Sequence, residues 1–346
     1  MDEIKLNKQH PLYKEDILRI LSIQNINKLK NKSFLITGAT GLIGVMLIDA
    51  LMSIEGVKIV AVGRSKEKAK NRLGEYFNNS NFKFIEQDVC EPFDSSICVD
   101  YIIPAASNTH PLAYSQFPIE TIMINVKGCE HALDLADLCG AIVLYPSTNE
   151  IYGNARSAES FIEDYNGILN LSNSRACYNE SKRVSEAMCQ SYLSEKGVKI
   201  IIARLCRVFG PTMLESDTKA SSQFIKNALL NENIVLKSDG MQYFSYTYVA
   251  DAVAGLLHVL INGEIGLAYN ISSSKTDSTL RNFAEICAKI NGNKVIFETP
   301  SEQERKGYSK AQTSILDNTR LIKSGFIPSY ELEDAINRTV KIIKNY

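Results

Sequence analysis

The sequence predicts an α/β fold, in which a doubly wound parallel Rossmann sheet is joined to a smaller C-terminal α/β substrate lobe. Three observations lead to this prediction. A short apolar run at residues 34–36 breaks into glycines and reopens as an apolar helix over residues 42–52. Short apolar runs then alternate with helical patterns to about residue 205, as they do in parallel sheets. Near Gly210 and Pro211 this alternation stops and shorter elements follow.

The glycine-rich segment between the first strand and helix has the spacing of a dinucleotide-binding turn. Gly38 permits a sharp turn, Gly41 lets the backbone approach a pyrophosphate, and Gly44 lets the helix lie close to the sheet. The unpaired N–H groups at the start of the helix would face the phosphates. Three glycines alone are a weak signal, but the strand before them and the helix after them supply the expected context.

The remaining elements follow from apolar periodicity. We expect a leading helix at 13–29, strands at 58–62, 82–85, 101–103, 142–145 and 199–203, and helices at 66–77, 119–139 and 178–195. In the smaller lobe we expect strands at 234–236, 246–249 and 295–297, and helices at 280–290 and 332–343. The predicted divisions are a leading segment 1–31, an NAD(P)-binding domain 32–205 with about 240–272, and a substrate lobe 206–239 and 273–346.

The composition excludes several classes of protein. The net charge is −1 over 346 residues, so no general basic surface favours nucleic acid or an anionic membrane. No apolar run is long enough to span a bilayer. The eight cysteines lack the spacing of a metal site, so we expect no metal and reduced thiols in a cytoplasmic protein.

The end of the second strand bears on the choice of cofactor. An acidic residue commonly binds the ribose hydroxyls of NAD at this point, whereas an arginine accommodates the 2′-phosphate of NADP. Here Gly63 stands at the acidic position and Arg64 follows, which favours NADP slightly over NAD. Alternatively, Arg64 stacks on the adenine of NAD or is simply solvated. Asp88 and Val89, after the third strand, are expected beside the adenine.

Tyr178 and Lys182 lie four residues apart, on one face of a predicted helix. A phenol with an ordinary pKa near 10 is a poor base at neutral pH, but nearby positive charge stabilises its phenolate. Tyr178 could then take a proton from an alcohol while a hydride leaves the adjoining carbon. Thr148, after the strand at 142–145, is placed to bind the same oxygen. An exposed helix face would explain Tyr178 and Lys182 equally well if no glycine loop preceded them.

Taken together, these motifs resemble the extended short-chain dehydrogenase/reductases of the NAD(P)-dependent sugar-nucleotide epimerase/dehydratase family. The resemblance runs from about residue 32 to the C-terminus. It rests on 37–44, Ala105-Ala106, 125–128, 147–153, Tyr178 with Lys182, and 208–211. It implies a cofactor site made by Gly38, Thr40, Gly41, Leu42, Ile43, Gly44, Arg64, Asp88, Val89, Ala105, Ala106, Asn125, Tyr178 and Lys182.

The residues beside Thr148 distinguish reactions within the resembled family. The dTDP-glucose 4,6-dehydratases carry Thr-Asp-Glu, and the UDP-glucuronate decarboxylases carry Thr-Ser-Glu, whereas this chain has Thr148-Asn149-Glu150. Asn149 has no titratable proton to donate, but Glu150 is a possible base. Simple 4-epimerases typically lack this glutamate. Glu150 could also be a supporting carboxylate outside the chemistry.

The segment 175–183 is similar to Arg-Ser-Cys-Tyr-Asp-Glu-Gly-Lys-Arg of the UDP-glucuronate decarboxylases. Two departures count against that activity. Phe244 stands where these relatives place an arginine that binds substrate phosphate or carboxylate, and Arg207 replaces an asparagine. Arg207 or Arg204 could supply the missing charge. The expected substrate-binding residues are Asn149, Arg175, Arg207 and Lys237.

The resemblance implies a nucleoside-diphosphate sugar oxidised at C4 to a 4-keto intermediate, with Tyr178, Lys182, Thr148 and Glu150 as catalytic residues. Dehydration or epimerisation in surface-glycan synthesis is the first expectation. The alternatives are an NADP-dependent 4-keto reductase or dehydrogenase, a UDP-glucuronate-type decarboxylase, and a non-catalytic NAD(P)-binding scaffold. By analogy, a homodimer is expected through the helices at 119–139 and 178–195.

Overall fold

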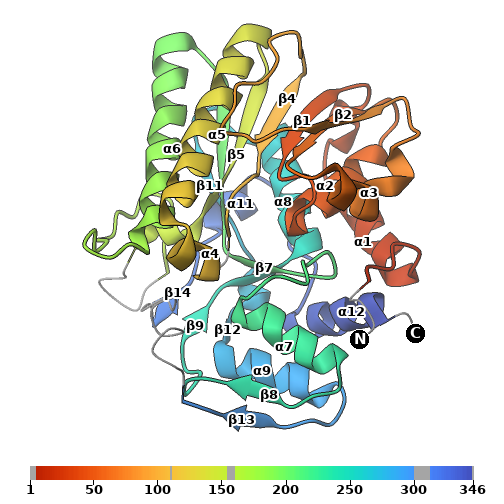
Figure 1. The fold of residues 1–346 in the computed structure, drawn as a ribbon, viewed down its shortest axis with the longest axis vertical. Helices are drawn as coiled ribbons and strands as arrows, with labels where there is room; N and C mark the ends of the chain where they lie inside the picture. Colours follow the sequence, from red (N-terminus) through yellow and green to blue (C-terminus); the bar gives the residue numbers. More distant parts are fainter. Residues whose placement is uncertain (1–4, 110, 154–159, 300–311, 345–346) are drawn as a thin grey trace.

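The computed structural model describes residues 5–109, 111–153, 160–299 and 312–344. A seven-stranded parallel sheet forms its centre, in the order β11-β6-β5-β4-β1-β2-β3 (Figure 1). The strands are β1 (Ser33–Thr37), β2 (Lys58–Gly63), β3 (Phe82–Glu86), β4 (Tyr101–Pro104), β5 (Ile142–Thr148), β6 (Ile200–Leu205) and β11 (Ala268–Ile271). The direction of winding reverses between β1 and β4, so ligands are expected at the carboxyl ends of these two strands. This sheet confirms the predicted fold class.

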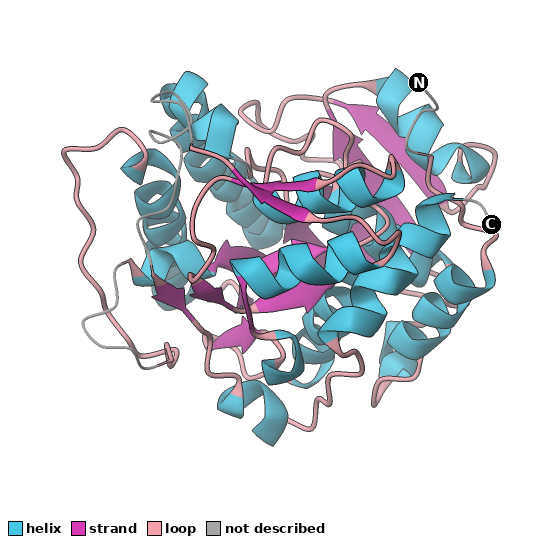
Figure 2. Cartoon of the chain, turned by 90° about the horizontal axis from the view of Figure 1, so that it is seen from below, coloured by secondary structure: helices cyan, strands magenta, loops and turns pink. Residues whose placement is uncertain are grey.

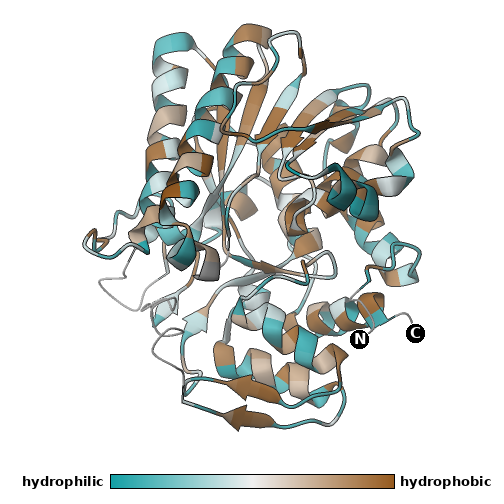
Figure 3. Cartoon of the chain, in the orientation of Figure 1, coloured by the Kyte–Doolittle hydropathy of each residue, from teal (hydrophilic) through white to brown (hydrophobic). Residues whose placement is uncertain are grey.

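Helices cover both faces of the sheet. One face carries α5 (Pro118–Cys139) and α6 (Ala176–Lys196), with the short α4 (Pro111–Gln116) before them. The other carries α2 (Leu42–Met52), α3 (Lys66–Leu73) and α8 (Val249–Asn262), with α1 (Pro11–Leu21) packed outside α2 and α8. The described apolar core accordingly divides into two large clusters, one for each face. Hydrophobic residues predominate in the strands between them (Figure 3).

Shorter elements form the part of the molecule beyond the carboxyl edge of the sheet (Figure 2). The helices are α7 (Ala220–Leu229), α9 (Leu280–Lys289), α11 (Thr319–Lys323) and α12 (Leu332–Lys344). The strands are β7 (Arg207–Phe209), β8 (Ile234–Leu236), β9 (Tyr243–Phe244), β10 (Tyr246–Tyr248), β12 (Ser278–Thr279), β13 (Val295–Phe297) and β14 (Thr313–Ser314). Parallel pairs join β7 to β10 and β8 to β13.

Some predicted boundaries are wrong. The leading helix ends at Leu21, because Asn25 adopts a left-handed backbone (φ 67°) that cannot continue a helix, and only a 3₁₀ turn (Ile26–Leu29) follows. The helix expected at 66–77 ends at Leu73, before a 3₁₀ turn. Strand β5 continues to Thr148, whereas β10 stops at Tyr248 and Val249 opens α8.

Two buried carboxylates fasten α1 and the segment before it to the rest of the chain. Asp49 on α2 accepts hydrogen bonds from Lys8, Tyr13 and Tyr76. Asp16 on α1 is fully buried and accepts hydrogen bonds from Tyr248, Tyr330 and Arg338. Burial raises the pKa of both carboxyl groups, although these partners favour the charged forms. The N-terminal helix thus contacts both the sheet region and the last helix.

Candidate active site

The glycine loop after β1 is shaped by the absence of side chains. Gly38 has φ +64°, and a Cβ there would lie 2.7 Å from the Ala105 carbonyl oxygen. A Cβ on Gly44 would lie 2.4 Å from the Gly38 carbonyl oxygen. Gly41 caps α2 without a side-chain hydrogen bond, so the first-turn N–H groups point outward without that competitor. The geometry supports the roles expected of these glycines.

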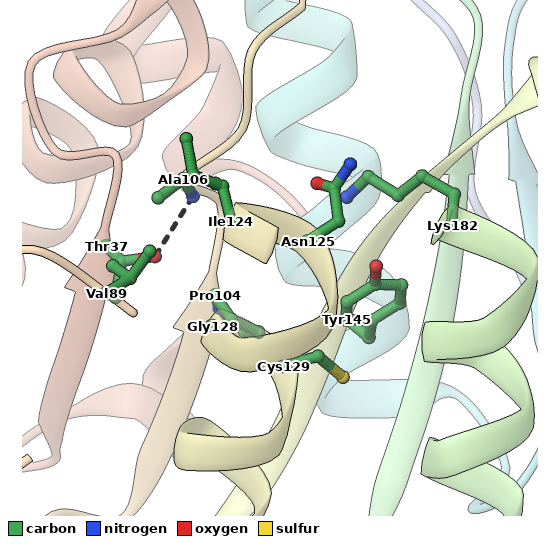
Figure 4. Close-up of a pocket in the computed structure, with 10 residues that line it drawn as sticks. All are labelled: Thr37, Val89, Pro104, Ala106, Ile124, Asn125, Gly128, Cys129, Tyr145 and Lys182. Carbon is green, nitrogen blue, oxygen red and sulfur yellow. Dashed lines mark hydrogen bonds between the residues drawn. The ribbon is translucent and has the colours of Figure 1, made fainter. Parts of the chain in front are cut away.

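A pocket opens beside this loop, at the carboxyl ends of the central strands (Figure 4). Its ten lining residues are Thr37, Val89, Pro104, Ala106, Ile124, Asn125, Gly128, Cys129, Tyr145 and Lys182. The Ala106 N–H donates to Thr37 Oγ1 at 3.0 Å, which joins the ends of β1 and β4. Four residues expected in the cofactor site, Val89, Ala106, Asn125 and Lys182, therefore surround one space.

Asn125 is held rigidly in this pocket. Its Oδ1 accepts a hydrogen bond from Ser107 at 2.8 Å, and its Nδ2 donates to Ser181 at 2.9 Å. The side chain is buried, and its amide lies toward the Lys182 ammonium in Figure 4. Ser181 is three residues after Tyr178 on α6, so Asn125 connects α5 to the helix that carries the expected catalytic residues.

Tyr178 and Thr148 come together as predicted. A hydrogen bond joins their side chains, and the Tyr178 ring stacks on Tyr114 with centroids 4.7 Å apart. Burial raises the pKa of Tyr178 to about 12, although the bond from Thr148 opposes this shift. Tyr178 is therefore a neutral phenol in the protein by itself, and it needs added positive charge to act as a base at neutral pH.

Lys182 lies one helical turn beyond Tyr178. Its Nζ donates to the Pro146 carbonyl at 2.8 Å and lies 4.7 Å from the centroid of the Tyr145 ring. Burial lowers the pKa of Lys182 to about 8. The ammonium is thus still the main form at pH 7, but it is held less firmly than at an exposed site.

Two side chains hold Glu150: Arg175, the N-cap residue of α6, and Asn179 in the first turns of α6. Arg175 donates to both carboxylate oxygens at 3.0 and 3.3 Å, and Asn179 Nδ2 donates to Oε2 at 3.1 Å. Burial alone would raise the pKa of Glu150, but the charge and hydrogen bonds of Arg175, helped by the charge of Arg207, hold it below its ordinary value. Glu150 is therefore ionised at neutral pH. Arg175, expected on the substrate, here binds the carboxylate.

The Asn149 side chain is bonded to another part of the protein. It is buried, and its Nδ2 donates to Ser314 at 2.9 Å, which joins the end of β5 to β14. Lys237, also expected on the substrate, directly follows β8 in the smaller lobe. The structure thus brings Thr148, Glu150, Arg175 and Tyr178 together.

Arg207 occupies an unusual position on β7. Its guanidinium carbon lies 3.5 Å from the centroid of the Phe244 ring, and its Nη1 is buried without a hydrogen-bond partner. The Tyr246 hydroxyl is also buried without a partner. Arg175 Nε and Asn179 Oδ1, beside Glu150, share this condition. Buried polar groups are normally satisfied, so these four atoms mark places where a ligand would supply partners.

At the outer end of the cofactor region, Arg64 forms an ion pair with Glu120 at 2.9 Å. Both side chains are exposed. Asp88 accepts a hydrogen bond from the Cys90 N–H at 2.9 Å. The carboxylate of Glu120 neutralises the charge that would attract a 2′-phosphate, and this contact was not foreseen from sequence.

Sequence reasoning also missed a buried network behind Thr148. Ser147 donates to Glu186, and Arg204 binds both Glu186 oxygens at 3.1 and 2.7 Å. Arg204 also donates to Tyr152 at 3.0 Å. The Arg204 guanidinium is thereby engaged by side chains of the protein. The one feature of the sequence that could have indicated this network is the position of Glu186, one helical turn after Lys182.

The residues present fit a dinucleotide. The loop excludes Cβ atoms where backbone must approach a ligand closely, and the open start of α2 provides N–H donors for phosphate. The pocket then leads to Asn125 and Lys182. The fold and this arrangement define a dehydrogenase-like enzyme of the Rossmann class.

The chain belongs to the NAD-dependent epimerase/dehydratase family, whose model matches residues 34–272. It is similar to UDP-glucuronic acid decarboxylase 1 of Xenopus tropicalis, with 31% identity over 92% of this chain and 73% of that protein. It is 35% identical to UDP-glucuronic acid decarboxylase 5 of Arabidopsis thaliana over 68% of each chain. The enzyme therefore belongs to a family that acts on nucleotide sugars with NAD.

Solved structures share the fold. A dTDP-glucose 4,6-dehydratase from Streptomyces venezuelae with NAD bound has a TM-score of 0.77 and 22% identity, covering 90% of this chain and 97% of that one. UDP-glucuronic acid 4-epimerase from Bacillus cereus, in complex with UDP-glucuronic acid and NAD, has a TM-score of 0.78 and 21% identity, covering 90% and 99%. Among the described residues, no helix is long and apolar enough to cross a membrane.

Proposed function

We propose that the protein converts a UDP-hexuronic acid by oxidation at C4, loss of carbon dioxide, and reduction of the resulting 4-keto sugar. The observation that carries the proposal is the meeting of Thr148, Tyr178 and an ionised, Arg175-bound Glu150 at the end of β5. The relatives named UDP-glucuronic acid decarboxylase support the choice of substrate.

The chain's own residues prepare the oxidation at C4. Thr148 orients the C4 hydroxyl, and Tyr178 takes its proton. Lys182 places a positive charge one turn away, while its bond to Pro146 fixes its position. NAD, when bound, would supply the hydride acceptor for the oxidation and the hydride donor for the later reduction. General-base assistance of this kind contributes about 10²–10⁴-fold to rate.

The second step is where decarboxylation fits the residues best. A 4-keto uronic acid loses carbon dioxide when its C5–C6 bond breaks and the electron pair passes into the C4 carbonyl. C5 of the resulting enolate then takes a proton from solvent water beside the Glu150 carboxylate, and Tyr178 returns its proton to the C4 oxygen when C4 is reduced. Dehydration instead requires an acid for the departing hydroxyl. Asn149 has no such proton and is bonded to Ser314, and Glu150 is ionised.

Dehydration or epimerisation, favoured by the sequence alone, is the second candidate. The observation that favours it is the carboxylate of Glu150, which could abstract a proton from C5 after oxidation at C4. Arg175 and Asn179 hold that carboxylate next to Thr148. A reductase or a non-catalytic scaffold would leave this second carboxylate without a role.

The proposal extends to cofactor, assembly and location. The Arg64–Glu120 pair favours NAD over the NADP suggested by Arg64 alone, because a carboxylate repels a 2′-phosphate. Exposed apolar side chains on α5 and α6, including Ile119, Met123 and Val184, support a homodimer through these helices. We propose a cytoplasmic enzyme of surface-glycan synthesis, with residues 206–239 and 273–346 as the lobe that binds the nucleotide sugar.

The proposal is tested by incubating the purified protein and NAD with UDP-, dTDP-, GDP- and CDP-sugars, each as the neutral sugar and the uronic acid where available. Products are then weighed by mass spectrometry. Loss of carbon dioxide from UDP-glucuronate or UDP-galacturonate is the expected result. Loss of water, or an unchanged mass with a new sugar configuration, would replace it with the second candidate.

A further inference from the structure

We propose that Arg207, held against the Phe244 ring, is the cationic group that binds an anion of the substrate, either the sugar carboxylate or the diphosphate. This inference rests on the proposed function and assigns the anion-binding role within it. Phe244 occupies the position at which the resembled enzymes carry an arginine for that purpose. In this chain, the positive charge for binding the anion would therefore come from Arg207 on β7.

The paired strands place the three side chains on one side of the sheet. Arg207 and Tyr246 are partners in the parallel β7–β10 pair, so their side chains leave the same face. Phe244 precedes Tyr246 by two residues, and their rings meet with centroids 6.5 Å apart. The Phe244 ring is buried and forms a flat support for the guanidinium. Stacking leaves the edge of a guanidinium, where its N–H groups lie, available to a planar or tetrahedral anion.

The Arg207 side chain is partly buried, and the buried end of its guanidinium lacks a hydrogen-bond partner. Within the described part of the chain, no hydrogen bond or ion pair from the Arg207 side chain is seen, and Nη1 is shielded from solvent. A buried N–H of a charged group is costly without a hydrogen-bond partner, and an anion would supply that partner. The Tyr246 hydroxyl nearby is a second buried donor without a partner. The two groups together present a buried N–H and a buried hydroxyl, both without partners, beside one positive charge.

Several other charged groups of this region already have partners, although Asp277, which acts on Cys206 together with Arg207, has a buried Oδ1 without one. Glu150 is bound by Arg175, Arg204 is bound to Glu186, and Lys219 is bound to Asp217 at 2.8 Å. The charge of Arg207 nevertheless helps to lower the pKa of Glu150, so the guanidinium lies within electrostatic reach of the reacting end. An anion at Arg207 would therefore belong to a molecule that also reaches Glu150 and Thr148.

A matched set of ligands identifies the anion. The NAD-loaded wild type and Arg207→Gln are titrated with UDP, UDP-xylose and UDP-glucuronate by calorimetry. UDP-xylose differs from UDP-glucuronate only by the carboxylate. We expect Arg207→Gln to raise the Kd of UDP-glucuronate at least tenfold. A change confined to UDP-glucuronate identifies the carboxylate, and an equal change for all three identifies the diphosphate.

Two further variants separate binding from folding. Arg281→Gln is the control, because Arg281 also lies over a phenylalanine, Phe297, but is exposed and paired with Glu285. It should leave all three Kd values unchanged. Phe244→Leu keeps an apolar side chain but removes the flat ring, and it should weaken the same ligands as Arg207→Gln by a smaller factor.

The outcomes separate this inference from the proposed function. Wild-type binding with less than a twofold change in both Arg207→Gln and Phe244→Leu would refute the role of Arg207 and leave the proposed function standing. Failure of the wild type to bind any of the three ligands would refute the proposed UDP-sugar function, and the inference with it.

Discussion

Two pairs of ionisable side chains lie near the end of β5. The surroundings favour the neutral forms in one pair and the charged forms in the other. In the Tyr178–Lys182 pair, burial moves both groups toward their neutral forms, with pKa values of about 12 and about 8. In the Glu150–Arg175 pair, mutual attraction keeps both groups charged. The first pair is poised to respond to charge brought by a ligand, whereas the second carries its own compensation.

The largest expected effect on turnover comes from changing the Tyr178–Lys182 pair. Tyr178→Phe keeps the ring that stacks on Tyr114 but removes the proton acceptor, so kcat should fall about 10³-fold. Steady-state turnover of the sugar found in the product screen measures this loss. Tyr192→Phe on the same helix is the control, because its hydroxyl bonds to Asp134 outside the site. Full activity of Tyr178→Phe would remove Tyr178 from the mechanism.

The next effect concerns stability and pH. The Lys182 pKa is about 8 in the folded protein and about 10.4 in the unfolded chain, so the unfolded state binds more protons between these values. The stability of the cofactor-free protein should therefore rise from pH 8 to pH 10, by about 2 kcal/mol from this group. Below pH 8 its unfavourable contribution is constant.

Lys182→Met isolates that contribution. Denaturant unfolding of the wild type and the variant at several pH values between 7 and 10.5 gives the free energy of unfolding of each protein as a function of pH. We expect the wild type to gain stability relative to Lys182→Met as pH rises. Parallel curves for the two proteins would show that burial does not depress the pKa of Lys182.

Breaking the compensated pair should affect the second step more than the first. Glu150→Gln keeps hydrogen bonds to Arg175 and Asn179 but has no charge and cannot handle the proton at C5. Overall turnover should fall about 10²-fold, while oxidation at C4 continues. Rapid quench and mass analysis would then detect the 4-keto species. An equal loss of both steps would mean that Glu150 only supports the site.

The smallest effect is expected at the exposed Arg64–Glu120 pair, where solvent screens the charges. Glu120→Gln releases Arg64 to meet a 2′-phosphate, so the preference for NAD over NADP should fall by roughly threefold to tenfold, about 1 kcal/mol. The ratio of kcat/KM for the two cofactors, or of their dissociation constants, measures it. Lys127→Gln, which removes an exposed charge paired with Glu130 on the same helix, is the control. An unchanged ratio would exclude Glu120 from cofactor selection.

Local sequence patterns were sufficient for the fold and for part of the site. The glycine turn, the helix at 42–52 and the strands at 234–236 and 295–297 were predicted with the bounds observed. The closeness of Tyr178 to Thr148 could be predicted because it depends on spacing along a helix and on a strand end, while the catalytic roles of Tyr178, Lys182 and Thr148 stay predictions. The leading helix was overextended because the apolar spacing continues past Asn25, where the backbone turns left-handed.

Contacts between distant segments could not be predicted in the same way. Glu150 and Arg175 are both visible in the sequence, but only the fold places the guanidinium on the carboxylate. Likewise, nothing in the order of residues shows that Arg207 lies on Phe244, or that Glu120 on α5 reaches Arg64. Each such pairing depends on the path of the chain, and each changes what the residue can do.

The burial of Asp16 has a consequence for biosynthesis. Its carboxylate is satisfied by Tyr248, Tyr330 and Arg338, and Arg338 follows it by 322 residues. A ribosome therefore delivers α1 long before its counter-charge. We expect nascent α1 to remain undocked while the Rossmann sheet assembles, and to lock into place only after α12 has left the exit tunnel. Helix α1 would then reach its native position after elements that are made later than it.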